Sequence, residues 1–167
     1  SPYAIVDYYD VDPDMAVDVN KRMAEFEKLV ERTHKAGLKV VIDFVPNHVA
    51  REYHSISCPN GIEDLGASDN KDWHFSTSNN CYYCWGHPFA PQFDIEHDSD
   101  GNPLPPYAEQ PAKATGNDVF SASPSKNDWY ETVKLNYGID YCDAGGRSEH
   151  FYDSEGKPIV DTWFKMT

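Results

Sequence analysis

The sequence predicts an α/β fold, and two neighbouring segments carry that prediction. From about position 20 to position 36, apolar residues recur at three- and four-residue steps with charged residues between them, which is the pattern of an amphipathic helix. Residues 38–45 follow as a short run of mostly β-branched and aromatic residues, typical of a strand buried on both faces of a parallel sheet. A helix that leads directly into such a strand is the second half of a strand-helix-strand unit.

The expected helix has recognisable signals at both ends. Asn20 can accept a hydrogen bond from the first turn as an N-terminal cap, and Gly37 can adopt the left-handed conformation that ends a helix. Its apolar side is formed by Met23, Phe26, Leu29, Val30 and Thr33. We therefore expect one face of this helix to pack on the rest of the protein.

The expected strand ends where polar side chains begin. Asp43 lies near its end, and Pro46, which cannot donate a ladder hydrogen bond, is followed by Asn47 and His48. The carboxyl ends of strands are where α/β folds and (β/α)8 barrels place their ligand sites. His48 is therefore a candidate ligand-binding residue. The alternative is a histidine that completes the core without contacting a ligand.

Residues 43–48, which read Asp-Phe-Val-Pro-Asn-His, resemble the first conserved region of the α-amylase family, glycoside hydrolase family 13. Residues 1–9, with Tyr3 and Asp7, are similar to the family's segment before barrel helix two, and residues 133–136 are loosely similar to its fifth region. The resemblance implies a fragment of a (β/α)8 barrel that holds helix 2, strand 3 and the start of helix 3. It also implies a long irregular, β-rich insertion, domain B.

On this resemblance we expect three parts. Residues 1–49 would be a barrel segment, residues 50–157 domain B, and residues 158–167 the start of the next barrel helix. Turn-forming residues recur every few positions after residue 49, while aromatic residues recur without helical period, and we expect one short helix at about residues 127–134. A complete barrel needs about 250 residues, and the chain has 167, so we expect the rest of the catalytic barrel to be its partner.

The resemblance also implies a function, the binding of an α-glucan such as starch or a maltooligosaccharide in a retaining glycoside hydrolase. Tyr3 would stack on a sugar ring, His48 would donate a hydrogen bond to the sugar, and Asp43 would orient the network at the strand end. The two carboxyl groups that such an enzyme needs are expected outside this chain, which alone would be inactive. The alternative is a non-catalytic carbohydrate-binding or assembly module of the same architecture.

An ion site is the remaining implication of the resemblance. Asn47 matches the position whose amide oxygen binds calcium in calcium-dependent members, and Asp7, Lys134 and Asn136 are the other residues assigned to this structural site. Where the family usually has an aspartate, this chain has Lys134, whose ammonium group cannot ligate a cation. We therefore expect either that the calcium site is lost or that Lys134 supplies the ion's positive charge by binding carboxylates.

Composition and cysteine content further limit the functions that the sequence predicts. The chain has 28 acidic and 14 basic residues and a net charge of −14, so binding to nucleic acid through phosphate neutralisation is not expected. No apolar run approaches the roughly 20 residues of a membrane span, and no membrane partner is expected. Free or buried thiols, disulfides and a zinc site are three open alternatives for Cys58, Cys81, Cys84 and Cys142.

Overall fold

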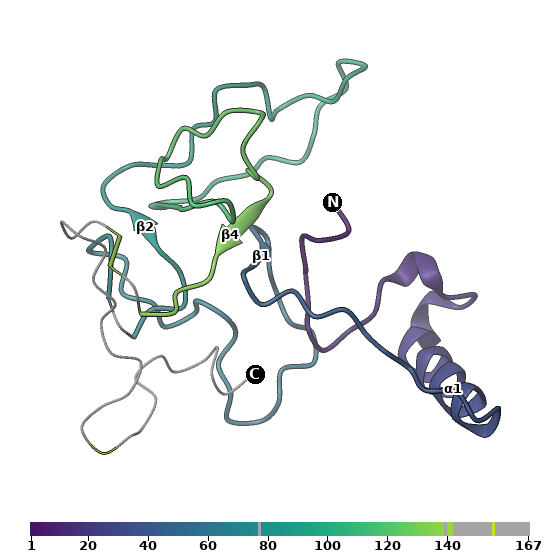
Figure 1. Ribbon diagram of the computed structural model, residues 1–167. Helices are drawn as coiled ribbons and strands as arrows, with labels where there is room; N and C mark the ends of the chain where they lie inside the picture. Colours follow the sequence, from purple (N-terminus) through teal and green to yellow (C-terminus); the bar gives the residue numbers. More distant parts are fainter. Residues whose placement is uncertain (77, 139, 142–154, 156–167) are drawn as a thin grey trace.

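A computed structural model describes residues 1–76, 78–138, 140–141 and 155 (Figure 1). Two short 3-10 helices, η1 (Pro13–Met15) and η2 (Val19–Lys21), precede the helix α1 (Arg22–Lys35). The strands are β1 (His48–Ala50), β2 (Tyr83–Cys84), β3 (Ala112–Lys113) and β4 (Thr132–Lys134). Turns and loops make up the rest of the described residues.

The strands form two small antiparallel pairs. β1 pairs with β4, and Val49 lies opposite Val133 in this ladder, while β2 pairs with β3. An isolated β-bridge joins Cys81, which lies shortly before β2, to Leu135, which directly follows β4. Both valines pack with these two residues and Tyr83 in one buried cluster, so the core lies where β1 and β4 meet the start of β2.

The predicted helix is confirmed as α1, and Gly37 follows it with a φ of +76° as expected of a residue that ends a helix. The predicted cap is wrong, because Asn20 donates its backbone N–H to the side chain of Asp18, which caps η2. None of the α1 residues is buried, and Figure 1 shows α1 at one side of the molecule, away from the strands. The helix thus forms from local signals, and the described residues cover its apolar face only in part.

The prediction of a buried strand at residues 38–45 is wrong. These residues have no strand conformation, and Leu38, Val41 and Ile42 keep 64%, 92% and 67% of their surface exposed. A parallel strand receives its hydrogen bonds and its cover from neighbouring strands and helices, and the described part of the chain places no strand beside this segment. The extended ladder begins instead at β1, for which β4 is a partner.

The predicted short helix at residues 127–134 is also wrong. Asp128 closes a turn by donating its backbone N–H to the carbonyl of Ser125 and accepting the Ser125 N–H on its side chain. Residues 132–134, Thr-Val-Lys, then extend as β4, where two β-branched side chains suit a strand. The helix expected to begin near Pro158, and with it residues 158–167, lies outside the described residues.

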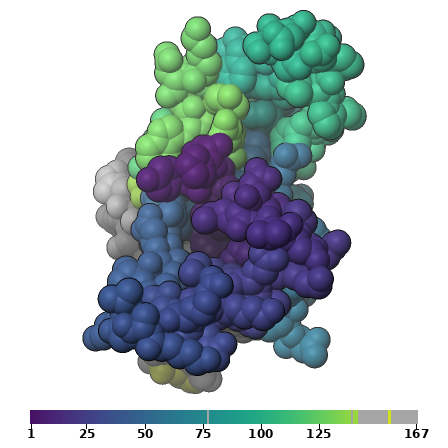
Figure 2. Space-filling view, turned by 90° about the vertical axis from the view of Figure 1, so that its right-hand side faces the viewer, coloured from purple at the N-terminus to yellow at the C-terminus, as the bar shows by residue number. Residues whose placement is uncertain are grey.

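Between β1 and β4 the described chain is irregular and held by aromatic pairs, as the sequence predicts. Tyr82 has ring contacts with Phe75 and Phe120, and Phe93 has its ring centroid 4.5 Å from that of Tyr130. No helix in the described part of the chain is long and apolar enough to cross a membrane. Figure 2 shows the purple N-terminal residues lying against the green segment that leads into β4, consistent with a bond of 3.0 Å between the Ser1 amino group and Glu131.

The structure bears on two of the alternatives for the cysteines. Cys58 and Cys81 are free thiols, and burial raises the pKa of Cys81 to about 12. Among the residues that the structure describes, no three histidine, cysteine or acidic side chains lie close enough to hold a metal ion. Cys142 lies outside that part.

Candidate functional site

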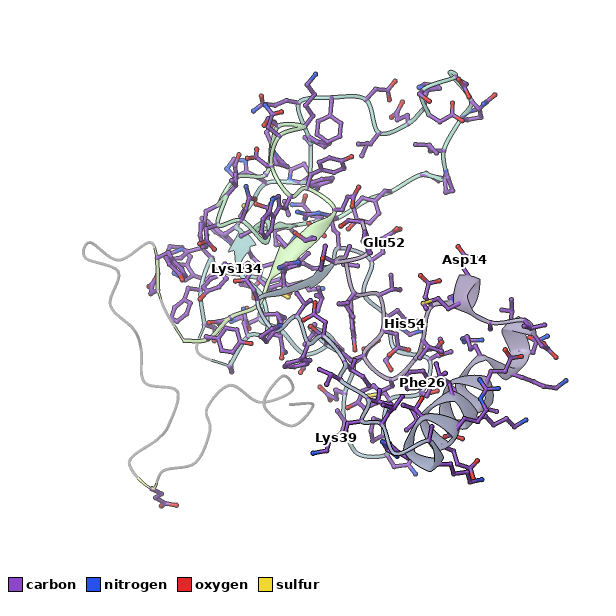
Figure 3. All side chains as sticks on the ribbon, turned by 45° about the vertical axis from the view of Figure 1, so that its right-hand side comes forward. Asp14, Phe26, Lys39, Glu52, His54 and Lys134 are labelled. Atoms are coloured by element: carbon purple, nitrogen blue, oxygen red, sulfur yellow. The ribbon has the colours of Figure 1, made fainter. Side chains whose placement is uncertain are left out.

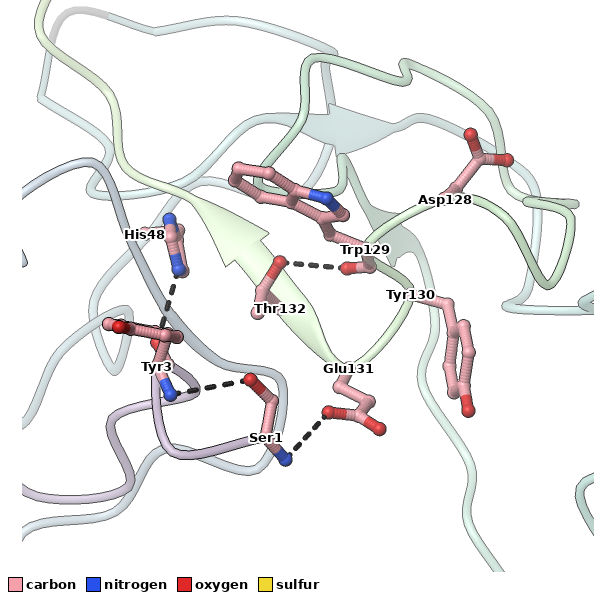
Figure 4. Close-up of a pocket in the computed structure, with 8 residues that line it drawn as sticks. All are labelled: Ser1, Tyr3, His48, Asp128, Trp129, Tyr130, Glu131 and Thr132. Atoms are coloured by element: carbon pink, nitrogen blue, oxygen red, sulfur yellow. Dashed lines mark hydrogen bonds and ion pairs between the residues drawn. The ribbon is translucent and has the colours of Figure 1, made fainter.

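A cavity of about 510 Å³ lies between the N-terminal segment, β1 and the turn that leads into β4 (Figure 4). Its volume is within the range of small-molecule sites, about 300–1,000 Å³. Tyr3 and His48, both predicted as sugar-binding residues, lie in its wall. The full lining is Ser1, Tyr3, His48, Asp128, Trp129, Tyr130, Glu131 and Thr132.

His48 is held by a different partner on each ring nitrogen. Its Nε2 lies 3.1 Å from the carbonyl oxygen of Tyr3, and its Nδ1 lies 3.0 Å from the amide nitrogen of Asn47. A carbonyl only accepts and an amide NH₂ only donates, so the proton resides on Nε2 and Nδ1 is the acceptor. His48 is therefore a neutral imidazole whose one N–H points along the cavity wall at the Tyr3 carbonyl (Figure 4).

Burial also favours the neutral form of His48, whose side chain and backbone together are only 6% exposed. Desolvation lowers its pKa below the ordinary value of 6.5, and the nearby ammonium group of Lys134 lowers it further, while the hydrogen bond to Tyr3 acts in the opposite direction. The imidazole is thus a fixed hydrogen-bonding group and not a resident cation.

Gly116 fixes the back of the imidazole. A Cβ at this position would lie 2.9 Å from the Cβ of His48 and 2.5 Å from the hydroxyl oxygen of Thr132, both too close for an ordinary contact. The Gly116 carbonyl accepts the Asn47 amide at 2.8 Å, and its N–H donates to the Thr132 hydroxyl at 3.1 Å. No local sequence signal identifies Gly116, because its role depends on contacts distant in the chain.

Tyr3 and Asp43 have different positions relative to the cavity. Tyr3 lines it through an exposed side chain, and its backbone carbonyl is the acceptor for His48. Asp43 is exposed and is absent from the lining, because residues 38–45 do not form the strand that was expected to direct it there. The structure thus brings Tyr3 and His48 together and leaves Asp43 outside.

Lys134 lies opposite His48 in the ladder and is buried. Figure 3 labels it beside β4, in the middle of the molecule. Its ammonium nitrogen lies 2.5 Å from a carboxylate oxygen of Asp118, and 5.5 Å from the ring centroid of Tyr141. The Lys134 ammonium group therefore neutralises the Asp118 carboxylate. The amide NH₂ group of Asn47, the residue expected to bind calcium, donates to the Gly116 carbonyl and to the His48 Nδ1.

The other two residues assigned to the ion site have structural partners. Asn136 is buried, and its amide donates to the carbonyl of Ser76 and accepts the N–H of Gly138. Both carboxylate oxygens of Asp7 accept backbone N–H groups, those of Tyr9 and Ile56. Each of these two side chains thus joins segments that are distant in the sequence, Asp7 to Ile56 and Asn136 to Ser76.

The turn at residues 128–132 is the part of the site that sequence reasoning missed. Trp129 places its ring centroid 5.3 Å from that of His48 in an edge-to-face arrangement. The Ser-Pro-Ser and Asn-Asp residues that precede Trp129 are turn formers. They were the available signal that this segment is a turn and not a helix.

Arg51 supports this turn from the protein interior. Its Nε donates to the carbonyl of Tyr130 at 2.8 Å and its Nη2 to that of Thr132 at 3.3 Å, while Nη1 binds Glu109 at 2.6 Å. The guanidinium also stacks over the ring of Phe89, 4.2 Å from its centroid. A buried ion pair thus anchors the wall of the cavity.

Comparison with known proteins identifies the family to which the chain belongs. The sequence model described as the α-amylase catalytic domain matches residues 1–100. The chain is 28% identical over 106 residues to the mouse amino acid transporter heavy chain SLC3A1, covering 48% of this chain and 15% of the relative. It is 43% identical over 51 residues to the trehalose-6-phosphate hydrolase of Bacillus subtilis (30% and 8%) and 28% identical over 95 residues to the α-amylase MalA of Haloarcula japonica (57% and 13%).

A cavity walled by aromatic rings beside one oriented imidazole has the features that small-molecule sites share. The family match covers more than half of the residues, and the chain belongs to the α-amylase family, whose catalytic domain is a (β/α)8 barrel. The chain spans 15% or less of the length of the curated relatives described above. No solved structure gives a significant match.

Proposed function

We propose that this chain is the substrate-binding and domain B segment of an α-amylase-type glycoside hydrolase that acts on α-glucans such as starch and maltooligosaccharides. The observation that carries the proposal is the meeting of Tyr3 and His48 in one cavity. Relatives named as an α-amylase, a maltase and a trehalose-6-phosphate hydrolase support a glycoside as the substrate. The rest of the catalytic barrel is the proposed partner.

The two side chains offer complementary contacts to a sugar. The exposed ring of Tyr3 can lie against a pyranose face, and the Nε2–H of His48 can donate to a hydroxyl group. That N–H now binds the Tyr3 carbonyl, so a sugar hydroxyl must share it or replace the carbonyl. Asp43 would orient this network once the other barrel strands flank residues 38–45.

We place the catalytic carboxylates outside these 167 residues. A retaining enzyme needs a nucleophile and a protonated general acid about 5–5.5 Å apart. Of the two cavity carboxylates, Asp128 accepts the N–H and the hydroxyl of Ser125, and these bonds lower its pKa, which is the wrong direction for a general acid. The other, Glu131, has a side chain that is 46% exposed, whereas a general acid is kept protonated by burial.

The test is the release of reducing sugar from soluble starch. The full-length protein that contains this chain is expected to hydrolyse starch, and the isolated 167-residue chain at high concentration is not. Turnover by the isolated chain that persists through purification and disappears with a substitution in this chain would contradict the placement of the carboxylates.

A second candidate is a non-catalytic assembly module, and one observation favours it. The matches to amino acid transporter heavy chains of mouse and human cover 48% of this chain. A full-length protein that is folded, has no glycosidase activity and binds no maltooligosaccharide would support this candidate over the first.

A further inference from the structure

Trp129 is one of two aromatic residues of the cavity wall, with Tyr130, that the proposed function does not use. Its surface is 52% exposed, although tryptophan residues are on average highly buried. Its ring contacts the imidazole of His48 edge-on, at 5.3 Å between centroids. One part of the indole is therefore next to the proposed sugar-binding imidazole, and another part is open to the cavity.

The neighbouring aromatic residue has a different environment. Tyr130 also lines the cavity, but its ring packs against Phe93 at 4.5 Å between centroids. Among the described residues, the only ring contact recorded for Trp129 is the one with His48. Of the two, Trp129 is the residue with an aromatic face that remains available to a ligand.

The backbone of Trp129 is fixed before any ligand binds. Its N–H donates to the side-chain oxygen of Asn117 at 3.1 Å, and its carbonyl accepts both the N–H and the hydroxyl of Thr132, at 2.9 and 2.7 Å. Arg51 holds the next carbonyl, that of Tyr130. A half-exposed indole on a turn held by these hydrogen bonds is a preorganised contact surface, which reduces the entropy lost on binding.

The polar groups around the indole match a polyhydroxylated ligand. Tyr3 and His48 lie on one side of the cavity, and Glu131, whose side chain is 46% exposed, lies on the other. A pyranose has an apolar face of C–H groups and a rim of hydroxyl groups, so it needs an aromatic surface together with hydrogen-bonding groups at its edge. The cavity presents both.

We infer that Trp129 is a sugar-stacking residue that contacts a pyranose ring of a maltooligosaccharide in the cavity lined by Tyr3 and His48. The inference rests on the proposed function and assigns a glucan contact to the turn between residues 128 and 132. In this arrangement the sugar lies between the N-terminal segment and the turn, and the indole also limits the movement of the His48 ring.

Calorimetric titration of the full-length protein with maltotriose tests the inference. Trp129→Ala is expected to weaken binding about tenfold, since the loss of roughly 1.4 kcal/mol of apolar contact changes a dissociation constant by that factor. Trp129→Phe, which keeps an aromatic face, is expected to retain most of the affinity. The matched control is Trp85→Ala, because Trp85 is equally exposed at 52% and does not line this cavity.

The outcomes separate the two proposals. If the unmodified protein binds no maltotriose, the proposed function fails. If it binds maltotriose and Trp129→Ala binds equally well, the role of Trp129 is wrong while the proposed function stands. Equal losses in Trp129→Ala and Trp85→Ala would also overturn the inference, because the effect would then not belong to this cavity. Thermal melts of each variant establish that the loss is one of binding and not of folding.

Discussion

His48 illustrates how much of the site depends on single hydrogen bonds. The Asn47 amide and the Tyr3 carbonyl together select the tautomer with the proton on Nε2. The Gly116 backbone packs so closely behind the imidazole that a Cβ at this position would lie 2.9 Å from the ring. The imidazole therefore presents one donor in one direction, which a sugar-binding group requires and a purely space-filling side chain does not.

Replacing His48 separates the two roles that a histidine can have here. If the full-length protein is the proposed hydrolase, His48→Ala is expected to reduce its kcat/KM by an amount equivalent to about 2.7–4 kcal/mol, the effect of removing a positioned donor from a transition state. The loss of stability is expected to be smaller. Steady-state kinetics and thermal melts of the same preparations measure both, and a variant with unchanged turnover or one that unfolds would support the core-histidine alternative.

The lowered pKa of His48 predicts a dependence of stability on pH. Its folded pKa lies below the ordinary 6.5, so the unfolded chain binds more protons in that range, and the free energy of unfolding falls as pH decreases through about 6.5. Urea unfolding at about pH 7.5 and about pH 5.5 measures the difference. The His48→Gln variant, which cannot titrate, is expected to lose less stability over the same interval, and an equal loss in both proteins would contradict the prediction.

At the scale of elements, one ladder and one buried ion pair hold the cavity together. The β1 and β4 strands place His48 and Thr132 on adjacent backbones, and Arg51, directly after β1, reaches the carbonyls on both sides of Glu131. The side chains of Arg51 and Glu109 are 5% and 6% exposed. Removing Arg51 would leave the buried Glu109 carboxylate with the Lys113 ammonium group, 3.4 Å away, as its cation.

Arg51→Ala is expected to destabilise the protein by about 3–5 kcal/mol, because it breaks this buried ion pair and removes the donor to the carbonyls of Tyr130 and Thr132. Lys35→Ala is the control, because Lys35 and Glu31 form an exposed i, i+4 pair at 2.7 Å that contributes about 0.3–0.5 kcal/mol. Chemical denaturation compares the two variants. A similar small effect of both substitutions would mean that Arg51 does not anchor the turn.

Features that depend on local signals could be predicted from the sequence, and features that depend on long-range contacts could not. The helix α1 and its end at Gly37 follow from local signals, and both are present. The apolar run at residues 38–45 could form a strand only beside other strands, which the described residues do not supply. Tyr3 and His48 could be assigned from their motifs, whereas Trp129 and Gly116 reach the site through long-range contacts that no local pattern encodes.

At the scale of the whole molecule, contacts of β4 with β1 join residues 1–49 to the irregular region that follows them. Lys134 lies on β4 opposite His48, and its ion pair with Asp118 supplies a positive charge next to the Asn47 segment. We propose that this ammonium group takes the place of a bound calcium ion. The positive charge then belongs to the chain itself and does not depend on the ion concentration.

The full-length protein is therefore expected to fold without calcium. A ligand that binds only the folded state raises Tm as its concentration increases, so melts in excess chelator and in millimolar calcium are expected to coincide. Lys134→Ala is expected to lower Tm in both, because Asp118 loses its cation. A rise of several degrees with calcium that disappears in Asn47→Ala would show that a calcium site is present.

The central claim is that Tyr3 and His48 hold an α-glucan in the cavity, and a crystal structure of the full-length protein with bound maltooligosaccharide tests it most directly. The account predicts a pyranose ring with heavy atoms within about 4 Å of the Tyr3 ring and a hydroxyl group within hydrogen-bonding distance of the His48 Nε2. A glucan bound at full occupancy elsewhere on the barrel, with His48 still donating only to the Tyr3 carbonyl, would contradict it.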